Sequence, residues 1–297
     1  MIHIVTDGKP GHLSQSRGLA EAIARQTDAV IHEDALSGTG DGTPRSNAAR
    51  TLVICAGHET HARALEHARQ AGGVAIALMN PGWLKRRRFD LSVIPEHDGI
   101  PASAKVELSV GTLNTVRPAT DVSPKRGLLL IGGPSKHHGW SNEGIATQLD
   151  AVIRADPSIE WTATTSRRTP EATVELLHGL STDHDKRLGY FPPSVTPPGW
   201  VGEQLQRCGV CWVTRDSVSM VYEALTSGAA VGLLDVPTRR GRPGRVVRGI
   251  DALVAREWVV GFDAWRNGTG LIRERPRLAE ADRIAEVVLQ RWPSLRG

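Results

Sequence analysis

The chain has 297 residues, more than one hydrophobic core usually serves, so we expect two domains of ordinary size. With 40% hydrophobic residues and no low-complexity tract, its composition excludes disordered and fibrous proteins. The formal net charge of +4 fits anionic substrates, a membrane surface or nucleic acid and does not choose among them. Three cysteines, no leader pattern and no long apolar run predict a cytoplasmic protein without disulfides or a membrane span.

Short β-branched runs alternate with helical patterns in the first part of the chain, which is typical of βαβ units in a parallel sheet. The predicted strands are residues 2–6, 29–32, 51–55, 74–78, 91–94 and 105–108, with helices at 14–25 and 60–71 and a flexible loop at 37–47. Residues 111–124, with two prolines and little periodicity, are the expected linker.

A second series of predicted strands begins after Gly127 and continues at 159–164, 211–214 and 230–234, and a last helical pattern covers 278–291. We therefore predict an α/β fold of two Rossmann-like doubly wound domains that face each other across a cleft. The expected boundaries are 1–118 for the N-terminal domain, 119–275 for the C-terminal domain, and 276–297 for a helix that packs back toward the first domain.

Residues 211–235 are predicted to form a buried strand, a polar turn, a short helix and a second strand. Asp216, Ser217 and Ser219 then lie at the carboxyl end of the strand and the amino end of the helix, where open α/β sheets bind ligands. The free N–H groups of a helix start suit a phosphate, and Glu223, one turn further on, could accept hydrogen bonds from two sugar hydroxyls. The alternative is that Asp216 or Ser217 only caps the helix.

Two other polar turns follow predicted strands of the second series, IGGPSKHHGWS at 131–141 and TTSRRTP at 164–170. The residues that offer donors or positive charge to a phosphate there are Gly132, Gly133, Ser135 and Lys136 in the first turn and Ser166, Arg167 and Arg168 in the second. Neither the turn at 131–141 nor the turn DGKPGH at residues 7–12 is GxxxxGK[ST] or GxGxxG, so the usual phosphate-loop and dinucleotide fingerprints are absent. Tight strand-to-helix turns and a solvated charge pair are the alternatives.

The first predicted strand leads into the turn DGKPGH, residues 7–12. Its glycines allow close backbone approach, Lys9 can meet an anion, and His12 supplies an imidazole, so the turn is suited to acid–base chemistry. The residues expected to contact the substrate are Asp7, Lys9, Gly11 and Gln15, together with Glu96 and His97 after the strand at 91–94.

The blocks DGKPGHLSQSRGLAEAI, IGGPSKHHGW, TTSRRTP and VTRDSVSMVYEAL closely resemble the ELM (elongated mitochondria) fission-protein family, many of whose bacterial members are described as glycosyltransferases. The resemblance extends from Asp7 to about residue 235. It implies a GT-B fold, with the acceptor held by the N-terminal domain and the nucleotide-sugar donor mainly by the C-terminal one. The implied activity is sugar transfer from a nucleotide-sugar to a hydroxyl acceptor, such as a cell-envelope glycan or glycolipid.

A more distant likeness, to the GT-B enzyme that adds N-acetylglucosamine to a lipid-linked muramyl peptide, implies that His12 is the catalytic base and that Glu223 contacts the donor ribose. Backbone amides of the C-terminal turns, with Lys136 and Arg167, would stabilise the departing nucleoside diphosphate. No metal is expected, because GT-B enzymes typically need none and the only DxD, residues 183–185, is expected to be a solvated loop. No nucleic-acid partner is expected either.

The segment WLKRRRF, Trp83 to Phe89, mixes basic and apolar residues and is the candidate for peripheral contact with an anionic inner membrane. A solvated basic loop is its alternative. Two other functions stay open: a non-catalytic GT-B-like protein that binds membranes or partners, as in mitochondrial fission, and a nucleotide-sugar epimerase that uses the same donor site.

Overall fold

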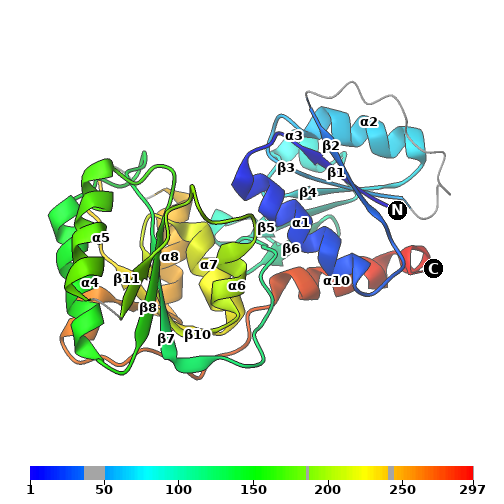
Figure 1. Cartoon of the computed structure of the whole chain (residues 1–297). Coiled ribbons are helices and arrows are strands. Elements are labelled where there is room, and N and C mark those ends of the chain that lie inside the picture. The colour runs from blue at the N-terminus through cyan, green and yellow to red at the C-terminus, as the bar shows by residue number, and fades with distance from the viewer. Residues whose placement is uncertain (37–50, 185–186, 240–243, 297) are drawn as a thin grey trace. The chain divides into compact units, whose positions relative to one another are not determined.

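The computed structural model describes residues 1–36, 51–184, 187–239 and 244–296, so the loop expected at 37–47 lies outside the described residues. The chain divides into two compact units (Figure 1). Unit 1 comprises Met1–Thr115 and Ala279–Gly297, and unit 2 comprises Val116–Leu278. In the described part of the chain, no helix is both long and apolar enough to cross a lipid bilayer.

Unit 1 contains a six-stranded parallel sheet in the order β2-β1-β3-β4-β5-β6, as the βαβ pattern predicts. Its strands are β1 (Ile2–Thr6), β2 (Ile31–Ala35), β3 (Leu52–Ala56), β4 (Val74–Leu78), β5 (Leu91–Pro95) and β6 (Val106–Ser109). The inner strands are buried on both faces, which explains why they read as continuous apolar runs. The strand order reverses between β1 and β3, and such a switch point is where open α/β sheets bind ligands.

Helices cover both faces of this sheet. They are α1 (Pro10–Ala24), α2 (His61–Ala71), the short α3 (Trp83–Arg86) and α10 (Glu280–Arg291), with 3₁₀ turns η2 (Glu96–Asp98) and η3 (Pro293–Leu295). Leu19 of α1 and Ile284 and Val288 of α10 share one core with Ile2 and Ile4 of β1, and the two helices lie side by side (Figure 1). The helix nearest the end of the chain therefore completes the core that the first strand begins.

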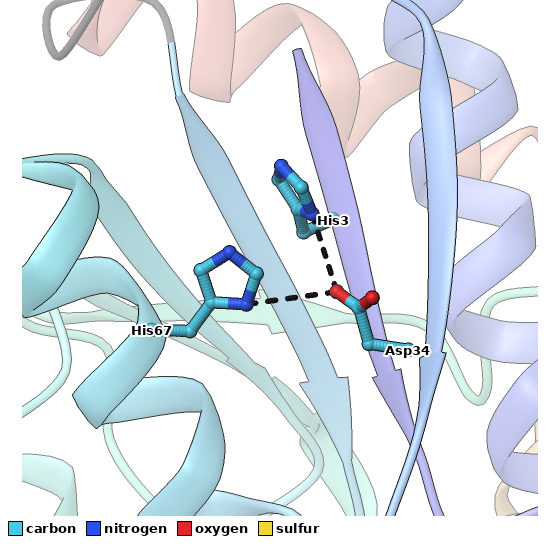
Figure 2. Close-up of side chains that lie close together, drawn as sticks. All are labelled: His3, Asp34 and His67. Carbon is cyan, nitrogen blue, oxygen red and sulfur yellow. Dashed lines mark hydrogen bonds and ion pairs between the residues drawn. The ribbon is translucent and has the colours of Figure 1, made fainter. Parts of the chain in front are cut away.

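The opposite face of the sheet packs against α2, with Val53 and Ala64 in a second apolar core. At the amino end of β1 this face carries polar residues instead: His3 on β1, Asp34 on β2 and His67 on α2 lie together (Figure 2).

Unit 2 contains a second six-stranded parallel sheet in the order β12-β11-β10-β7-β8-β9. The strands are β7 (Ser123–Ile131), β8 (Glu160–Thr165), β9 (Leu188–Tyr190), β10 (Cys208–Thr214), β11 (Ala230–Leu234) and β12 (Val260–Gly261). Counted from β7, this is the 3-2-1-4-5-6 order of Rossmann domains, whose switch point lies between the first and fourth strands. The turns after β7 and β10 therefore meet at the ligand edge.

The helices of unit 2 are α4 (Asn142–Ala155), α5 (Glu171–Asp183), α6 (Trp200–Leu205), α7 (Val218–Ser227), α8 (Arg245–Ala255) and α9 (Phe262–Arg266). Two buried tryptophans fill space that glycines leave on the neighbouring strand. A Cβ on Gly127 would lie 2.2 Å from the ring of Trp161, and one on Gly232 would lie 2.5 Å from the ring of Trp212. Large and small residues on adjacent strands thus interlock in the core.

Three local expectations need correction. The first helix begins at Pro10 and not at residue 14, because proline is preorganised for a first helical position. The strands β9 and β12 are not predicted from the sequence, because they have too few residues to show periodicity. His184 of the DxD segment is buried, and its Nε2 lies 2.7 Å from Asp150, so it is not part of a solvated loop, while Asp185 lies outside the described residues.

Candidate functional site

In unit 1 two polar residues at the switch point, Asp7 and His12, form a pair. Asp7 directly follows β1, and His12 lies in the first turn of α1, which brings its ring back over the carboxylate. The His12 Nδ1 atom is 2.9 Å from Asp7 Oδ2 and 3.1 Å from Oδ1. The Asp7 side chain is buried, whereas that of His12 is 25% exposed. The Nε2 atom of His12 has no hydrogen-bond partner among the described residues.

Lys9 completes this group. Its ammonium bonds Asp7 Oδ2 at 2.9 Å and Glu59 at 3.0 Å, and its backbone N–H donates to Asp7 Oδ1 at 3.2 Å. Burial by itself would raise the pKa of Asp7, but hydrogen bonds from Lys9 and then from His12 lower it to about 2. A carboxylate that stays ionised holds the proton of His12 on Nδ1, so Nε2 keeps a lone pair for accepting a proton. Asp7 therefore orients His12 and is not free to contact a substrate.

Gly57, which follows β3 across the switch point, makes room for this pair. Its φ is +92°, and a Cβ there would lie 2.5 Å from His12 Nδ1 and 3.2 Å from Asp7 Oδ2. Any side chain would both strain the backbone and displace the imidazole. Sequence reasoning missed Gly57, although a glycine directly after a buried strand is a usable signal for close approach.

The other predicted residues of unit 1 include Gln15, on α1, and Glu96 and His97, after β5. Gln15 is buried and donates to the Gly11 carbonyl at 3.1 Å and to the sulfur of Met79 at 3.7 Å. Glu96 and His97 lie in η2, after β5, which is two strands away from β3 at the same sheet edge. Gln15 therefore supports the local structure.

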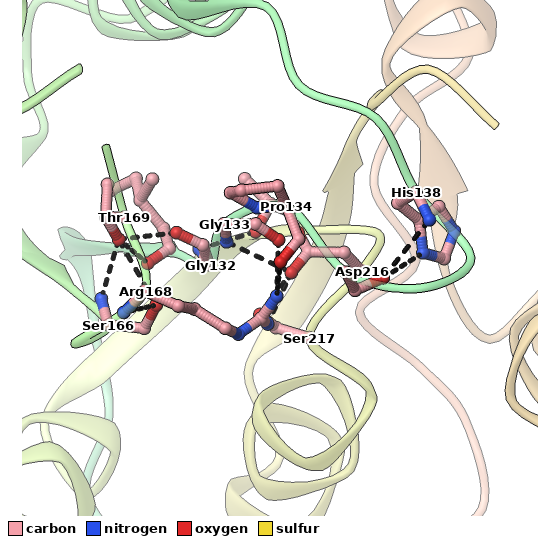
Figure 3. Close-up of polar contacts among 12 residues, drawn as sticks. Gly132, Gly133, Pro134, His138, Ser166, Arg168, Thr169, Asp216 and Ser217 are labelled. Carbon is pink, nitrogen blue, oxygen red and sulfur yellow. Dashed lines mark hydrogen bonds and ion pairs between the residues drawn. The ribbon is translucent and has the colours of Figure 1, made fainter. Parts of the chain in front are cut away.

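In unit 2 three turns meet around the buried carboxylate of Asp216, which follows β10 (Figure 3). Its Oδ2 accepts the N–H of Gly133, after β7, at 3.1 Å and the hydroxyl of Ser217 at 3.1 Å, and it forms an ion pair with Arg168, after β8. Arg168 also donates to the Gly133 carbonyl and, at 2.9 Å, to Ser217 Oγ. The structure brings all three predicted turns together, and the Asp216–Arg168 pair is their junction.

The glycines of the first turn serve this junction. A Cβ on Gly132 would lie 2.1 Å from Ser217 Oγ, and one on Gly133 would lie 2.3 Å from the Arg168 carbonyl oxygen. The Gly132 N–H donates to Thr214 Oγ1 at 2.7 Å, while the Gly133 N–H bonds Asp216. Both N–H groups are therefore used inside the protein and are not free for a phosphate, contrary to expectation.

Two predicted hydroxyls are also used locally. Ser135 Oγ accepts the backbone N–H groups of His137 at 3.2 Å and His138 at 3.1 Å, and Ser166 Oγ lies 3.2 Å from Thr169 Oγ1. Thr169 in turn donates to the Gly132 carbonyl. Burial lowers the pKa of His138, although the Asp216 carboxylate opposes that shift. The sequence analysis missed His138, and also Thr169 and Thr214, whose partner Gly132 lies in another turn.

The amino end of α7 remains available. Ser217 stands at the N-cap position but makes no capping hydrogen bond, so the alternative interpretation as a helix cap is wrong. The N–H groups of Val218, Ser219 and Met220 find no acceptor within the described residues. Lys136 and Arg167, in the turns after β7 and β8, are exposed and form no ion pair with the described residues. Unused N–H groups at a helix start suit an anion, and the two cations belong to the turns that meet beside that helix.

Glu223 lies in the second turn of α7 and makes no hydrogen bond or ion pair with the described residues. Burial raises the pKa of its carboxyl to about 7. A desolvated carboxylate without a partner gains from any donor that reaches it, so two adjacent sugar hydroxyls would suit it.

The family profile described as mitochondrial fission ELM1 matches residues 10–292 of the chain. A comparison with curated protein sequences found no match. The fold resembles S. aureus MnaA solved with UDP, with a TM-score of 0.54 and 12% identity over 100% of this chain and 91% of that one. It also resembles Methanocaldococcus jannaschii UDP-GlcNAc 2-epimerase in complex with UDP-GlcNAc and UDP, with a TM-score of 0.51 and 11% identity over 97% and 99% of the two chains.

A third similar structure is the Neisseria meningitidis UDP-GlcNAc 2-epimerase bound to UDP-GlcNAc, with a TM-score of 0.50 and 10% identity over 98% of each chain. At these identities the likeness concerns the fold. It confirms the prediction of a GT-B-like α/β architecture made of two Rossmann-like domains.

Proposed function

The chain belongs to the mitochondrial fission ELM1 family, and we propose that it is a metal-independent glycosyltransferase that moves a sugar from a nucleotide-sugar to a hydroxyl acceptor. The observation that carries the proposal is the ligand edge of unit 2. The polar groups of its three turns satisfy one another, while the amino end of α7, Lys136 and Arg167 are left without partners among the described residues.

A departing nucleoside diphosphate carries negative charge that must be stabilised in the transition state. The N–H groups of Val218, Ser219 and Met220, together with Lys136 and Arg167, would supply that stabilisation without a metal ion. Because the Asp216–Arg168 junction holds the turns in place, these donors need little reorganisation when the ligand binds.

Glu223 supports the assignment of the nucleotide end. Its partly buried carboxylate would accept hydrogen bonds from the two ribose hydroxyls, which restore the interactions that it lost on burial. A UDP species is the first probe to use, because the similar structures of S. aureus and Methanocaldococcus jannaschii contain UDP.

His12 would act as the general base. In the proposed step the acceptor oxygen attacks the anomeric carbon, the bond from that carbon to the diphosphate oxygen breaks, and the acceptor proton moves to His12 Nε2. Asp7, hydrogen-bonded to Nδ1 at 2.9 Å, would stabilise the imidazolium that forms. The nucleoside diphosphate leaves with the bonding electrons.

The acceptor would be a cell-envelope glycan or a lipid-linked sugar. Trp83 and Leu84 are large apolar side chains exposed on α3, and Lys85 and Arg88 beside them are exposed as well. Such a surface would hold the protein at an anionic bilayer, where a lipid-linked acceptor is found. Replacing both Trp83 and Leu84 by serine should reduce binding to vesicles that contain phosphatidylglycerol, measured by sedimentation.

The proposal is tested by nucleotide binding. A thermal-shift screen with UDP, GDP, CMP and dTDP should show stabilisation by one of them, about 2.7 kcal/mol at one hundred times its dissociation constant. Calorimetry should then give at least tenfold weaker binding for a Lys136→Gln and Arg167→Gln double variant. A matched control changes Lys125 and Arg126 to glutamine, which removes the same charge at the amino end of β7.

The alternatives give different results. A non-catalytic binding protein would respond to no nucleotide. An epimerase would interconvert UDP-sugars in the absence of any acceptor, visible by proton NMR. Release of UDP that depends on an added hydroxyl acceptor supports transfer, and equal weakening by both double variants would contradict the proposed diphosphate site.

A further inference from the structure

We infer that His3, Asp34 and His67 form a binding site for a divalent transition-metal ion in unit 1, separate from the Asp7–His12 pair. His3 lies near the amino end of β1, whereas Asp7 and His12 follow its carboxyl end. The inference does not depend on the proposed glycosyl transfer.

The geometry of the three donors suits a small metal ion. One ligand atom from each residue lies within 4.8 Å of the others. Asp34 Oδ2 is 3.2 Å from His3 Nδ1 and 3.5 Å from His67 Nδ1, and Figure 2 shows both rings turned toward the carboxylate. Ligands of a tetrahedral zinc ion, at about 2.0–2.1 Å from the metal, are about 3.3 Å apart. The two separations from Asp34 Oδ2 are therefore already close to those around a coordinated ion.

The topology explains how these residues meet. The β1–β2 register pairs His3 with His32 and Val5 with Asp34, so alternate side chains His3, His32 and Asp34 lie on one face of the sheet. His67 approaches that face from α2, with its ring centroid 4.3 Å from that of His3. The ring of His32 stacks on that of His3, with 5.4 Å between the ring centroids.

Hydrogen bonding alone does not account for the burial of two imidazoles here. The side chains of His3 and His67 are 3% and 12% exposed, and the Nε2 atom of each is buried without a hydrogen-bond partner among the described residues. Buried polar atoms are normally paired, so these imidazoles are buried at a cost in free energy, which metal coordination through their Nδ1 atoms would offset. Asp34, 31% exposed, leaves one side open through which an ion can enter.

The chemistry of the ligands indicates the class of metal. Two imidazoles and one carboxylate suit zinc and its neighbours among the divalent transition metals better than calcium or magnesium, which prefer oxygen ligands. The strand β2 is an edge strand with mostly exposed residues, so few apolar contacts hold it in place. A bound ion would stabilise its packing against β1 and α2.

The test uses the full chain after treatment with EDTA. Zinc chloride titrated in a calorimeter should show one saturable site per chain, and cobalt(II) should give the visible absorption of a tetrahedral complex. His67→Ala and Asp34→Asn should each weaken zinc binding at least tenfold and remove the rise in melting temperature caused by zinc. His58→Ala is the control, because this histidine is 80% exposed and lies outside the cluster.

Circular dichroism checks that each variant is folded. If His67→Ala does not fold, Asp34→Asn decides, because asparagine keeps the shape of this partly exposed side chain. Unchanged zinc affinity in the folded cluster variants, or binding that is lost equally in His58→Ala, would overturn the inference. UDP affinity should be the same with and without zinc, which separates this result from the donor-site experiments.

Discussion

Each sheet carries a polar group at its switch point, but the two groups are built from different kinds of contact. In unit 1, Asp7 and His12 are five residues apart in the sequence, and the imidazole keeps one nitrogen unpaired within the described residues. In unit 2, Asp216, Arg168 and Gly133 come from three turns that follow three strands. A base needs an unoccupied lone pair, whereas an anion site needs a rigid frame around unused N–H groups.

The two buried aspartates show the same difference. Asp7 stabilises one ring, and its hydrogen bonds to Lys9 and His12 keep it ionised. Asp216 accepts a backbone N–H and a hydroxyl and pairs with Arg168, so it determines the position of the turns. Changes in unit 1 should therefore affect turnover, and changes in unit 2 should affect nucleotide binding and stability.

His12→Ala should have the largest effect. Loss of a general base slows such reactions by about 10²–10⁴-fold, while UDP affinity should change less than about twofold. Initial rates of acceptor-dependent UDP release and calorimetry with UDP measure the two quantities. His58→Ala, in an exposed position, should retain full activity. Normal turnover in the His12 variant would remove this residue from the mechanism.

Asp7→Asn should reduce turnover by about 10–100-fold. The neutral amide neither holds the proton on His12 Nδ1 nor stabilises the imidazolium as the carboxylate does. It should also change acid stability. The pKa of Asp7 is lowered from 3.8 to about 2, so its stabilising contribution is present above pH 4 and is lost as the pH falls toward 2. Melting temperatures from pH 5 to pH 2 should therefore fall less in the variant, and parallel curves would contradict the lowered pKa.

Asp216→Asn should weaken UDP binding about tenfold and lower the free energy of unfolding by about 2–3 kcal/mol, because Arg168 loses its charged partner. Urea denaturation and calorimetry measure these effects. Gly133→Ala should act in the same direction, since its Cβ would lie 2.3 Å from the Arg168 carbonyl oxygen. If Asp216→Asn left UDP affinity intact, the junction would not position the anion site.

Glu223→Gln should have the smallest effect on UDP binding, with an affinity several-fold lower. It should increase the stability of the protein at high pH. Burial raises the pKa of Glu223 from 4.5 to about 7. Ionisation of this carboxyl therefore lowers the free energy of unfolding progressively between pH 4.5 and 7, and by a constant amount above pH 7. At pH 8 the variant should be more stable by up to about 3 kcal/mol, and at pH 4.5 equally stable. UDP affinity of the unchanged protein should rise with pH through 7, whereas that of the variant should not.

Much of the fold follows from local pattern. Buried parallel strands need continuous apolar runs, so β4 and β11 have the boundaries that the sequence predicts. Turn residues such as those at 131–141 and 164–170 mark the carboxyl ends of strands without knowledge of the sheet order. The sequence thus indicates which turns can form a ligand edge and which residue types they bring to it.

The sequence by itself determined two parallel α/β sheets and the turns that carry their polar residues, because apolar periodicity and turn chemistry are local properties. Only the tertiary structure decided the partners: Arg168 meets Asp216, and Gly57 makes room for His12. Side chains on separate turns become neighbours through the order of the strands, which the sequence does not state. The same reason explains why Asp216 is a structural junction and why Ser217 does not cap its helix.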